Sequence, residues 1–437
     1  MVFTLPRETE ITGEVVADFI KQHQLLRPLY LENKNMYEGH HAILDRQARD
    51  AYKPDNRLVV NLAKYIVDTF NGFFIGVPVK ESHENEPVHE AINDFRRRSD
   101  IENTEAELAK MTSIYGHAYE YLYQDENAHT CAVYNSPLDI FVVYDDTIAQ
   151  KPLFAVRYAY DADNKISGEL YTESERFELT EGKQGVALVN PTPHYYGGVP
   201  IIEYIENEER QSVFENVKTL INALNNALSA KADDVEYFAD AYLKIVGAEL
   251  DETTMADLRA NRTINLSGDG SNDVVIEFLA KPSADQTQEN LIDRLLDLIY
   301  QIAMVANIND ERFGNASGVA LEFKLQPMRN LAIMKERKFK SSIQERYKMV
   351  FALPTNIQSV YRDEWLNIKY QFTRNIPRNI AEEAQVASQL NGLVSQSTML
   401  STLSIVDDVK DEIAKIDEEG ISINMSDFEL SNRLGSE

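Results

Sequence analysis

The strongest constraint in the sequence is a long helical pattern that follows a polar loop and contains a proline. Apolar residues recur at spacings of three and four from Val319 to Val350, which predicts a helix of about 35 residues and about 50 Å. Residues 307–318 before it are rich in Asn, Asp and Gly, which favour a sharp chain reversal. Pro327 lies in the first third of the helix, where a missing backbone hydrogen bond predicts a kink.

Length and charge limit the classes of protein that this chain can belong to. A chain of 437 residues is expected to form two or more substructures. Its formal net charge of −28 argues against a protein that holds nucleic acid through a large basic surface. The single cysteine, Cys131, excludes an intramolecular disulfide and favours a reducing compartment. The start lacks signal-peptide character and no apolar run reaches about 20 residues, so we expect a soluble protein made inside the cell.

The first half of the chain predicts helices followed by a mostly antiparallel sheet. Thr12 is a candidate N-cap for the first helix, and the segment Pro54-Asp55-Asn56 offers a cap for a second helix that Gly72 ends. Residues 73–79 have the composition of a strand, and a helix is expected around 104–115. From 119 to 204, aromatic and β-branched runs predict strands at 119–123, 132–134, 140–144, 154–160 and 167–171.

The second half predicts two long helices that flank a small insert. Helices are expected at 213–242 and from 291 to 306, with strands at 243–246, 263–266 and 274–279 between them. This order suits an antiparallel helical pair that holds a compact α/β unit at its far end. After the kinked helix, residues 366–372 alternate like a strand, and the chain from Pro377 is helical and acidic. The predicted fold class is therefore α+β and mainly helical.

A search for catalytic, metal and cofactor motifs favours none of them. Lys183 is followed by Gln184 where a phosphate-binding loop needs Ser or Thr, and a zinc helix starting at His83 would meet Pro87. His40 and His41 are adjacent and would point apart on a helix. The pairs at 145–146, 233–234 and 407–408 could bind metals, although acidic pairs in so acidic a chain are usually solvated. Cys131 is expected to be a small buried apolar residue.

One charge pattern is harder to explain as solvated surface. Between 324 and 348 the predicted long helix carries eight basic residues and only two acidic ones, Glu336 and Glu345. Such a face can meet acidic groups of its own subunit, an acidic neighbouring subunit, or nucleic acid. The first two are favoured, because the field of the whole chain opposes DNA binding. The candidate inter-subunit residues are Lys335, Arg337, Lys338 and Lys340.

The order of several short segments resembles the portal proteins, or head-to-tail connectors, of siphophage-type tailed bacteriophages. The resemblance covers nearly the whole chain, and no single segment carries it alone. The segments are 54–61 (PDNRLVVN), 72–78 (GFFIGVP), 115–120 (YGHAYE), 198–204 (GVPIIEY), 315–321 (NASGVAL) and 372–379 (FTRNIPRN).

The resemblance implies a domain plan and a function. It implies a wing at 1–212, stem helices at 213–242 and 285–306, a clip at 243–284, a tunnel loop at 307–317, the kinked helix with a wing strand at 318–376, and a crown at 377–437. Copies would form a closed ring, of twelve in this family, at one capsid vertex, through which double-stranded DNA is packaged and ejected. The chain would act in the virion, after assembly in the host cytoplasm, and would be no enzyme and need no cofactor.

The resemblance also implies partners and functional residues. The clip would dock the terminase large subunit and later the head-completion adaptors, and the ring would meet the major capsid and scaffolding proteins during procapsid assembly. Tunnel-loop residues near DNA would be Asn307, Asn309, Asp310, Glu311, Arg312 and Asn315. Clip residues for docking would be Asp251, Glu252, Arg259, Asp269 and Asp273.

The net charge is compatible with this reading, because anionic channel walls would keep DNA from sticking. Two other readings stay open from the sequence. One is a helical oligomeric scaffold without DNA passage. The other is a metal-dependent nuclease that uses Asp233 and Asp234.

Overall fold

The computed structural model describes residues 2–49, 54–163, 165–182, 185–239, 243–246, 275–278, 285–308, 318–375, 380–403, 405–406 and 409–419. The chain divides into two compact units, Met1–Arg374 and Asn375–Glu437. Taken over the whole chain, the described elements are mixed α+β and about half helical, so the α+β class expected from the sequence is confirmed, whereas the chain is less helical than expected.

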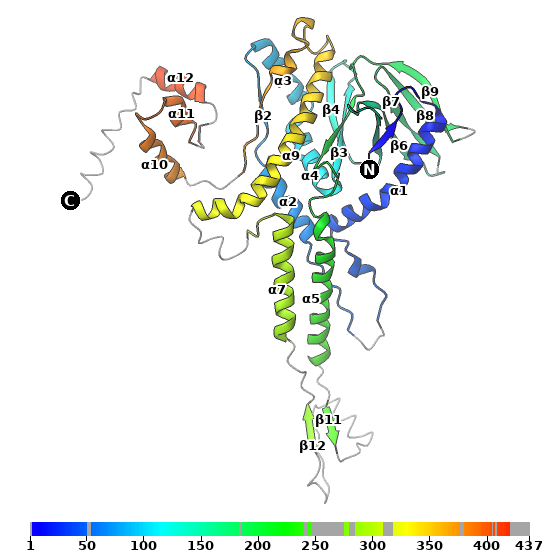
Figure 1. Cartoon of the computed structure of the whole chain (residues 1–437), viewed down its shortest axis with the longest axis vertical. Helices are drawn as coiled ribbons and strands as arrows, with labels where there is room; N and C mark the ends of the chain where they lie inside the picture. Colours follow the sequence, from blue (N-terminus) through cyan, green and yellow to red (C-terminus); the bar gives the residue numbers. More distant parts are fainter. Residues whose placement is uncertain are drawn as a thin grey trace, which may run out of the picture. The chain divides into compact units, whose positions relative to one another are not determined.

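A six-stranded sheet forms one part of the first unit. Its strand order is β1 (Phe3–Leu5), β5 (Ile140–Asp145), β6 (Pro152–Tyr160), β7 (Ile166–Tyr171), β8 (Glu175–Gly182) and β9 (Gly185–Pro193), parallel between β1 and β5 and antiparallel elsewhere. Helix α1 (Gly13–Glu38) packs on this sheet (Figure 1). Thr12 caps α1 by accepting a hydrogen bond from the Val15 N–H, as predicted. Phe19 and Ile20 of α1 share a buried core with Phe141 and Phe154.

A second sheet and the two helices α3 (Glu86–Arg98) and α4 (Ile101–Tyr115) form the centre of the unit. The sheet runs β10 (Ile201–Ile205), β3 (His117–Gln124) and β4 (Thr130–Asn135), all antiparallel. Helix α4 leads directly into β3, and α3 precedes it. The predicted strands between 119 and 171 and the helix around 104–115 are thereby confirmed.

The prediction for residues 73–79 was wrong. Helix α2 (Leu62–Ile75) continues through Gly72 and is capped at its start by Asn61, whose side chain accepts the Lys64 N–H. Phe73 and Phe74 are buried, and the Phe74 ring lies edge-on to Phe339 with 5.6 Å between centroids. Packing against a helix far along the chain thus outweighs the local β propensity of this segment.

The predicted helical pair is present beyond the sheets. Helix α5 (Lys218–Ala239) follows the 3₁₀ turn η2 (Glu215–Val217) and lies beside α7 (Asp285–Ala303) (Figure 1). Lys231 forms an ion pair with Glu289 between the two helices, and Gln288 donates to Asp234 at 3.1 Å. Between them in sequence, β11 (Leu243–Val246) and β12 (Val275–Phe278) pair antiparallel. The strand expected at 263–266 lies outside the described residues.

The long helix has the predicted length. Helix α9 (Gly318–Ala352) contains 35 residues, includes Pro327, and visibly bends in its N-terminal part (Figure 1). Its apolar face is buried at Leu325, Met328, Ala332, Phe339, Ile343, Tyr347 and Val350. The predicted spacing of three and four therefore marks the side that faces the core.

Short elements complete both units. In the first unit, β13 (Lys369–Gln371) pairs antiparallel with β2 (Lys80–Ser82), and the 3₁₀ turns are η1 (Ala42–Asp45), η4 (Ser359–Tyr361) and η5 (Glu364–Asn367). The strand expected at 366–372 is therefore shorter than predicted. In the second unit, α10 (Ile380–Leu390), α11 (Gln396–Leu400) and α12 (Val409–Glu419) share a core around Ala387, Met399 and Leu400. Within the described residues, no helix is long and apolar enough to cross a membrane.

Gly116 is required at the tight link between α4 and β3. Its φ is +89°, and an added Cβ would lie 2.1 Å from the Arg210 carbonyl oxygen. Gly116→Ala is therefore expected to lower the free energy of unfolding by about 2–4 kcal/mol. The matched control is Gly72→Ala in α2, where no described atom lies within 4 Å of the added Cβ, and a gain of about 0.5–1 kcal/mol is expected. Urea denaturation of both variants measures the contrast, and equal effects would contradict it.

Candidate functional site

The predicted tunnel loop begins at a clamped end of α7. Tyr65 of α2 donates a hydrogen bond to the Ala306 carbonyl at 3.2 Å, and its hydroxyl accepts the Ile308 N–H at 3.0 Å. Its ring lies edge-on to Tyr300 of α7, with 5.7 Å between centroids. Tyr65 thus fixes where the chain leaves α7, a role that no local pattern in the sequence indicated. Of the predicted loop residues, Asn307 is described, whereas Asn309, Asp310, Glu311, Arg312 and Asn315 lie outside the described residues.

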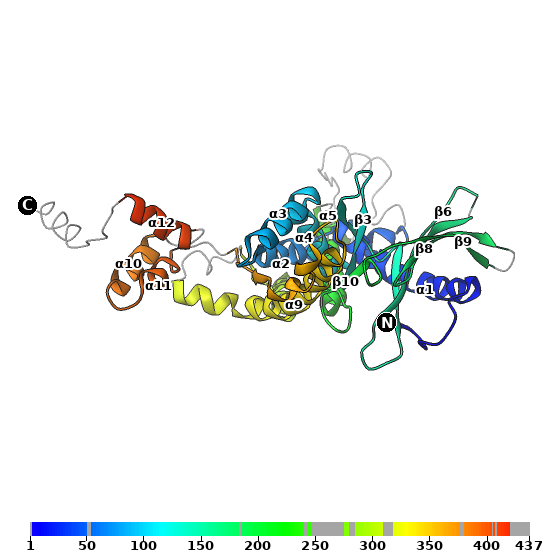
Figure 2. The same ribbon diagram turned by 90° about the horizontal axis from the view of Figure 1, so that it is seen from above.

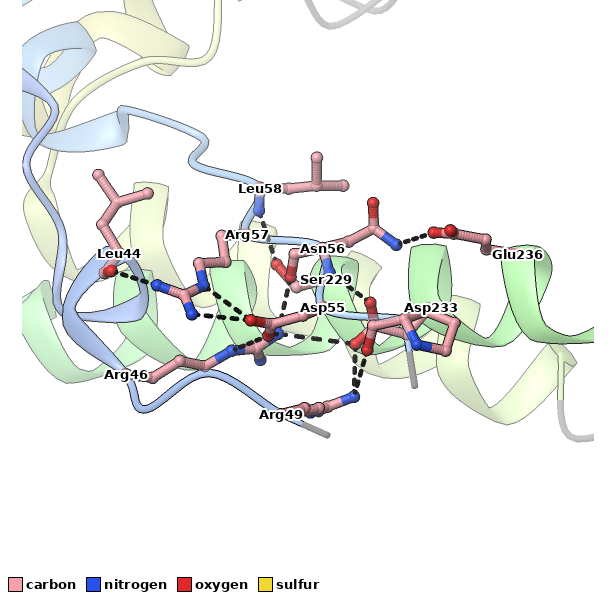
Figure 3. Close-up of polar contacts among 11 residues, drawn as sticks. Leu44, Arg46, Arg49, Asp55, Asn56, Arg57, Leu58, Ser229, Asp233 and Glu236 are labelled. Atoms are coloured by element: carbon pink, nitrogen blue, oxygen red, sulfur yellow. Dashed lines mark hydrogen bonds and ion pairs between the residues drawn. The ribbon is translucent and has the colours of Figure 1, made fainter. Parts of the chain in front are cut away.

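The segment 54–61, one of those that carried the resemblance, lies extended along α5 (Figure 3). Alternate backbone N–H groups donate to side chains spaced four residues apart on the helix. The pairs are Asn56 with Asp233 at 2.6 Å, Leu58 with Ser229 at 2.8 Å, and Val60 with Asn225 at 2.8 Å. Two residues of an extended chain advance about 6.6 Å and four helical residues about 6 Å, so the two repeats match closely. This match ties the amino-terminal region to α5.

Charged side chains reinforce that attachment (Figure 3). The Asp55 carboxylate accepts from Arg57 at 2.7 Å and from the Arg46 Nε at 2.9 Å, and these contacts, chiefly the hydrogen bond from Arg57, lower the pKa of Asp55. Arg57 also donates to the Leu44 carbonyl at 2.7 Å. Arg49 pairs with the buried Asp233 at 2.8 Å. The cluster holds the chain on both sides of 50–53 against α5.

These contacts also bear on the acidic pairs considered as metal sites. Both oxygens of Asp233 are occupied, one by the Asn56 N–H and one by Arg49. Asp145 accepts from the Thr147 hydroxyl and backbone at its own turn, and the pair 407–408 lies outside the described residues. Among the described residues, no group of three or more His, Cys, Asp or Glu side chains is arranged to hold a metal ion. Three of these carboxylates, Asp145, Asp233 and Asp234, therefore have protein partners.

Lys335 corrects part of the predicted inter-subunit face. Its ammonium is buried inside the subunit, 2.7 Å from Glu206, and donates to the Ala109 carbonyl at 2.8 Å and to Ser113 at 2.7 Å. Burial lowers the pKa of Lys335, and Glu206 opposes this shift. Such a residue cannot face a neighbouring subunit. It lies on the inner side of α9 because it is four residues before Phe339, in the row of the apolar face.

A larger buried cluster surrounds Arg346, eleven residues further along α9. The Arg346 guanidinium donates to Glu105 of α4 at 2.6 Å, to Glu120 of β3 at 2.8 Å, and to the Tyr204 hydroxyl of β10 at 2.9 Å. Glu81 of β2 lies 3.8 Å away and is paired with Arg96 at 2.8 Å. The cluster therefore joins four elements to α9 through one side chain.

This cluster contains more carboxylates than cations, which affects its proton content. Two arginines, Arg346 and Arg96, face Glu81, Glu105 and Glu120. Burial raises the pKa of Glu105 to about 7, and the nearby Glu81 carboxylate adds to the rise, although Arg346 opposes it. Glu105 thus keeps a proton into the neutral range.

The remaining basic residues predicted on α9 lie nearer the surface. Arg337 is exposed, Lys338 is half-buried and pairs with Glu208, and the exposed Lys340 lies 5.7 Å from the centroid of the Tyr370 ring. The structure thus separates the four residues, because Lys335 lies inside and the other three lie outside.

Other sequence candidates have ordinary surroundings. Cys131 is buried in β4, as predicted. His83 contacts Glu364 at 3.2 Å, and His41 is buried with its ring beside Asn225 at 3.2 Å, so His40 and His41 are no simple surface pair. Lys183 and Gln184 lie outside the described residues. So do the predicted docking residues of the clip, Asp251, Glu252, Arg259, Asp269 and Asp273.

Comparison with known proteins gives consistent similarities. A family described as "Phage portal protein, SPP1 Gp6-like" matches residues 17–425. The portal protein of Bacillus phage SPP1 is 27% identical over 397 residues, covering 86% of this chain and 78% of that protein. The portal protein of Clostridium phage phiCD119 is 23% identical over 434 residues, covering 92% and 94%. A chain from the neck of an empty GTA particle, computed with C6 symmetry, aligns with a TM-score of 0.47 at 10% identity, covering 77% of this chain and 88% of that one.

The raised pKa of Glu105 predicts a pH-dependent stability. Between its unfolded value of 4.5 and about 7, the folded protein keeps a proton that the unfolded chain releases. The stabilisation is therefore complete below pH 4.5, is lost as pH rises to about 7, and amounts to about 3 kcal/mol. Glu105→Gln mimics the protonated form, so its stability relative to the unmodified chain should rise across this window in urea titrations.

The control for Glu105→Gln is Glu107→Gln on the same helix. Glu107 is half-buried and pairs with Lys110 at 2.5 Å, so its replacement should change stability by less than about 1 kcal/mol. It should also leave the pH trend of the unmodified chain in place. A constant difference between Glu105→Gln and the unmodified chain from pH 4.5 to 8 would contradict the assignment.

Proposed function

This chain belongs to the SPP1 Gp6-like family of phage portal proteins, and from that premise we propose that it forms a ring that conducts double-stranded DNA at one capsid vertex. As a portal protein it is a structural component of the virion and not an enzyme. The observation that carries the proposal is the family match across residues 17–425. The ring would hold twelve copies and act in both packaging and ejection.

The described elements support a division of labour along the chain. We assign the wing to 1–212, the stem to 213–242 and 285–306, the clip to 243–284, the tunnel loop to 307–317, the long helix and wing strand to 318–376, and the crown to 377–437. The paired helices α5 and α7, with the β11–β12 pair between them in sequence, support the stem and clip. The clip would dock the terminase large subunit and then the head-completion adaptors, and the ring would meet the major capsid and scaffolding proteins while the procapsid assembles.

The contacts at the loop exit support a mechanical role. Tyr65 holds the chain on both sides of Asn307, and the 54–61 segment holds α5 through hydrogen bonds at regular intervals. A loop that starts from a fixed point can contact passing DNA without disturbing the ring. The net charge of −28 supports a conduit that repels its cargo, since firm binding of phosphates needs cations.

Imaging of the purified chain tests the ring. We expect single-particle images to show a closed ring with a central channel wider than the DNA duplex, which is about 20 Å across. Nucleotide hydrolysis is not expected, because packaging energy would come from a separate motor. Particles without a channel, or filaments, would favour an assembly scaffold without DNA passage.

A shortened loop tests DNA contact. Removal of Asp310 to Asn315 should leave the ring intact and lower the yield or length of packaged DNA, because the loop no longer reaches the axis. The control replaces the same residues with a Gly/Ser segment of equal length, which separates reach from side-chain chemistry. DNA recovered from purified phage particles measures the outcome. Normal packaging by the shortened variant would reject the tunnel-loop assignment.

A further inference from the structure

Helices α3 and α9 present their outer faces on opposite sides of the first unit. Phe95 of α3 and Tyr347 of α9 meet in the core, with 5.9 Å between ring centroids, so the buried faces of the two helices are directed toward each other. At about 100° per residue, Glu86 and Glu90 lie about 140–180° around α3 from Phe95, and Arg337, Ser341 and Lys348 lie about 80–120° around α9 from Tyr347. Figure 2 shows α3 and α9 on opposite sides of α4.

The outer face of α9 is basic in its C-terminal half. Arg337, Ser341 and Lys348 are exposed and fall at spacings of four and seven, and we name them the basic stripe. Within the described residues Arg337 has no ion pair. Lys348 pairs with Glu345 of the same helix at 2.9 Å, and an exposed pair of this kind contributes little. The positive charges of the basic stripe are therefore available to a binding partner.

The outer face of α3 carries more acidic than basic residues, with the exposed Arg97 on the same face in the last turn. Glu86, Glu90 and Asp94 are exposed at spacings of four, and we name them the acidic stripe. Within the described part of the chain Glu86 and Glu90 have no ion pair, whereas Asp94 pairs with Arg97 at 2.6 Å. The acidic stripe spans about 12 Å and the basic stripe about 16 Å along their helices, so their lengths match.

A groove borders the C-terminal part of the basic stripe. The groove of about 770 Å³ runs along this part of α9 and is bordered on its other side by the turn between β5 and β6. Ser341 and Lys348 line it together with Ala149 and Lys151 of that turn. A helix laid in this groove would bring its charges next to the basic stripe.

We propose that the basic stripe of one copy docks against the acidic stripe of a second copy of this chain. The inference rests on the proposed ring. In a closed ring each contact is heterologous, which means that one surface of a subunit meets a different surface of its neighbour. Opposite charges on those surfaces favour the correct pairing and speed association. Passing DNA is the less favoured occupant, because the stripe offers two cations in a chain with a net charge of −28.

Charge reversal on each side tests this contact. Arg337→Glu/Lys348→Glu and, separately, Glu86→Lys/Glu90→Lys should each lower ring formation about tenfold or more in 50 mM salt, because repulsion replaces attraction. The loss by either variant should become smaller, relative to the unmodified chain, in 500 mM salt. An equal mixture of the two variants should restore rings with an even number of subunits, because every alternating contact again pairs opposite charges. Mass photometry and electron microscopy measure ring formation.

Controls separate the contact from folding and from total charge. Lys21→Glu/Lys34→Glu on α1 changes the net charge by the same amount as the basic-stripe variant and should leave ring formation unchanged, since neither residue belongs to the basic or the acidic stripe. Each variant must unfold at the temperature of the unmodified chain. Where a variant does not, its neutral version, Arg337→Gln/Lys348→Gln or Glu86→Gln/Glu90→Gln, replaces it and should give a smaller loss in the same direction.

Each remaining outcome has a defined meaning. Normal rings from both charge-reversed variants, or no recovery in the mixture of folded variants, would overturn the pairing and leave the proposed ring standing. If the basic-stripe variant forms normal rings but its phage particles contain less packaged DNA, the pairing of the two stripes is overturned and the basic stripe contacts DNA instead. If the unmodified chain forms no ring at any salt concentration, the proposed function fails and the pairing fails with it.

Discussion

Arg346 joins parts of the chain that are far apart in sequence because its buried guanidinium needs acceptors from each of them. Its contacts come from α4, β3 and β10, with the β2 carboxylate nearby. A buried charge without partners is costly, and the planar guanidinium accepts few arrangements of them, so these elements must stay in place together. Lys335, three turns earlier on the same face, repeats the arrangement with Glu206. Between them lie Phe339 and Ile343, so α9 has one register against the core.

Helix α2 extends this order to α5 and α7. Its cap residue Asn61 ends the segment that lies along α5, Tyr65 holds the exit of α7, and Asn71 accepts from Lys335 at 3.3 Å. Phe74 then packs on Phe339 of α9. One helix thus links α5, the chain that leaves α7 and the anchored part of α9. Forces on α5 or α7 would be transmitted to α9 through these contacts, which suits the mechanical role proposed above.

Sequence periodicity predicted much of the fold and less of the site. The length of α9, the strands between 119 and 171 and the helical pair with its small strand pair follow from spacing and composition alone. The sequence also contained a signal for Lys335, since it falls in the apolar row of α9 with Ala332 and Phe339. A count of charges along the helix misses this signal, because it ignores the angular position of each residue around the helix axis. Tyr65 and the contacts of 54–61 with α5 had no local signature, because their partners lie far away in the chain.

The sequence by itself determined the order of the elements, the period of each helix face, the anionic net charge and the portal family, because all of these are properties of neighbouring residues or of sums over the chain. The tertiary structure decided which charges are available at the surface. It buried Lys335 and Arg346 among carboxylates from other elements and left Arg337 and Lys348 outside. The physical reason is that the position of a charge depends on long-range packing, and the cost of burying it is offset only where distant chain segments bring acceptors to it.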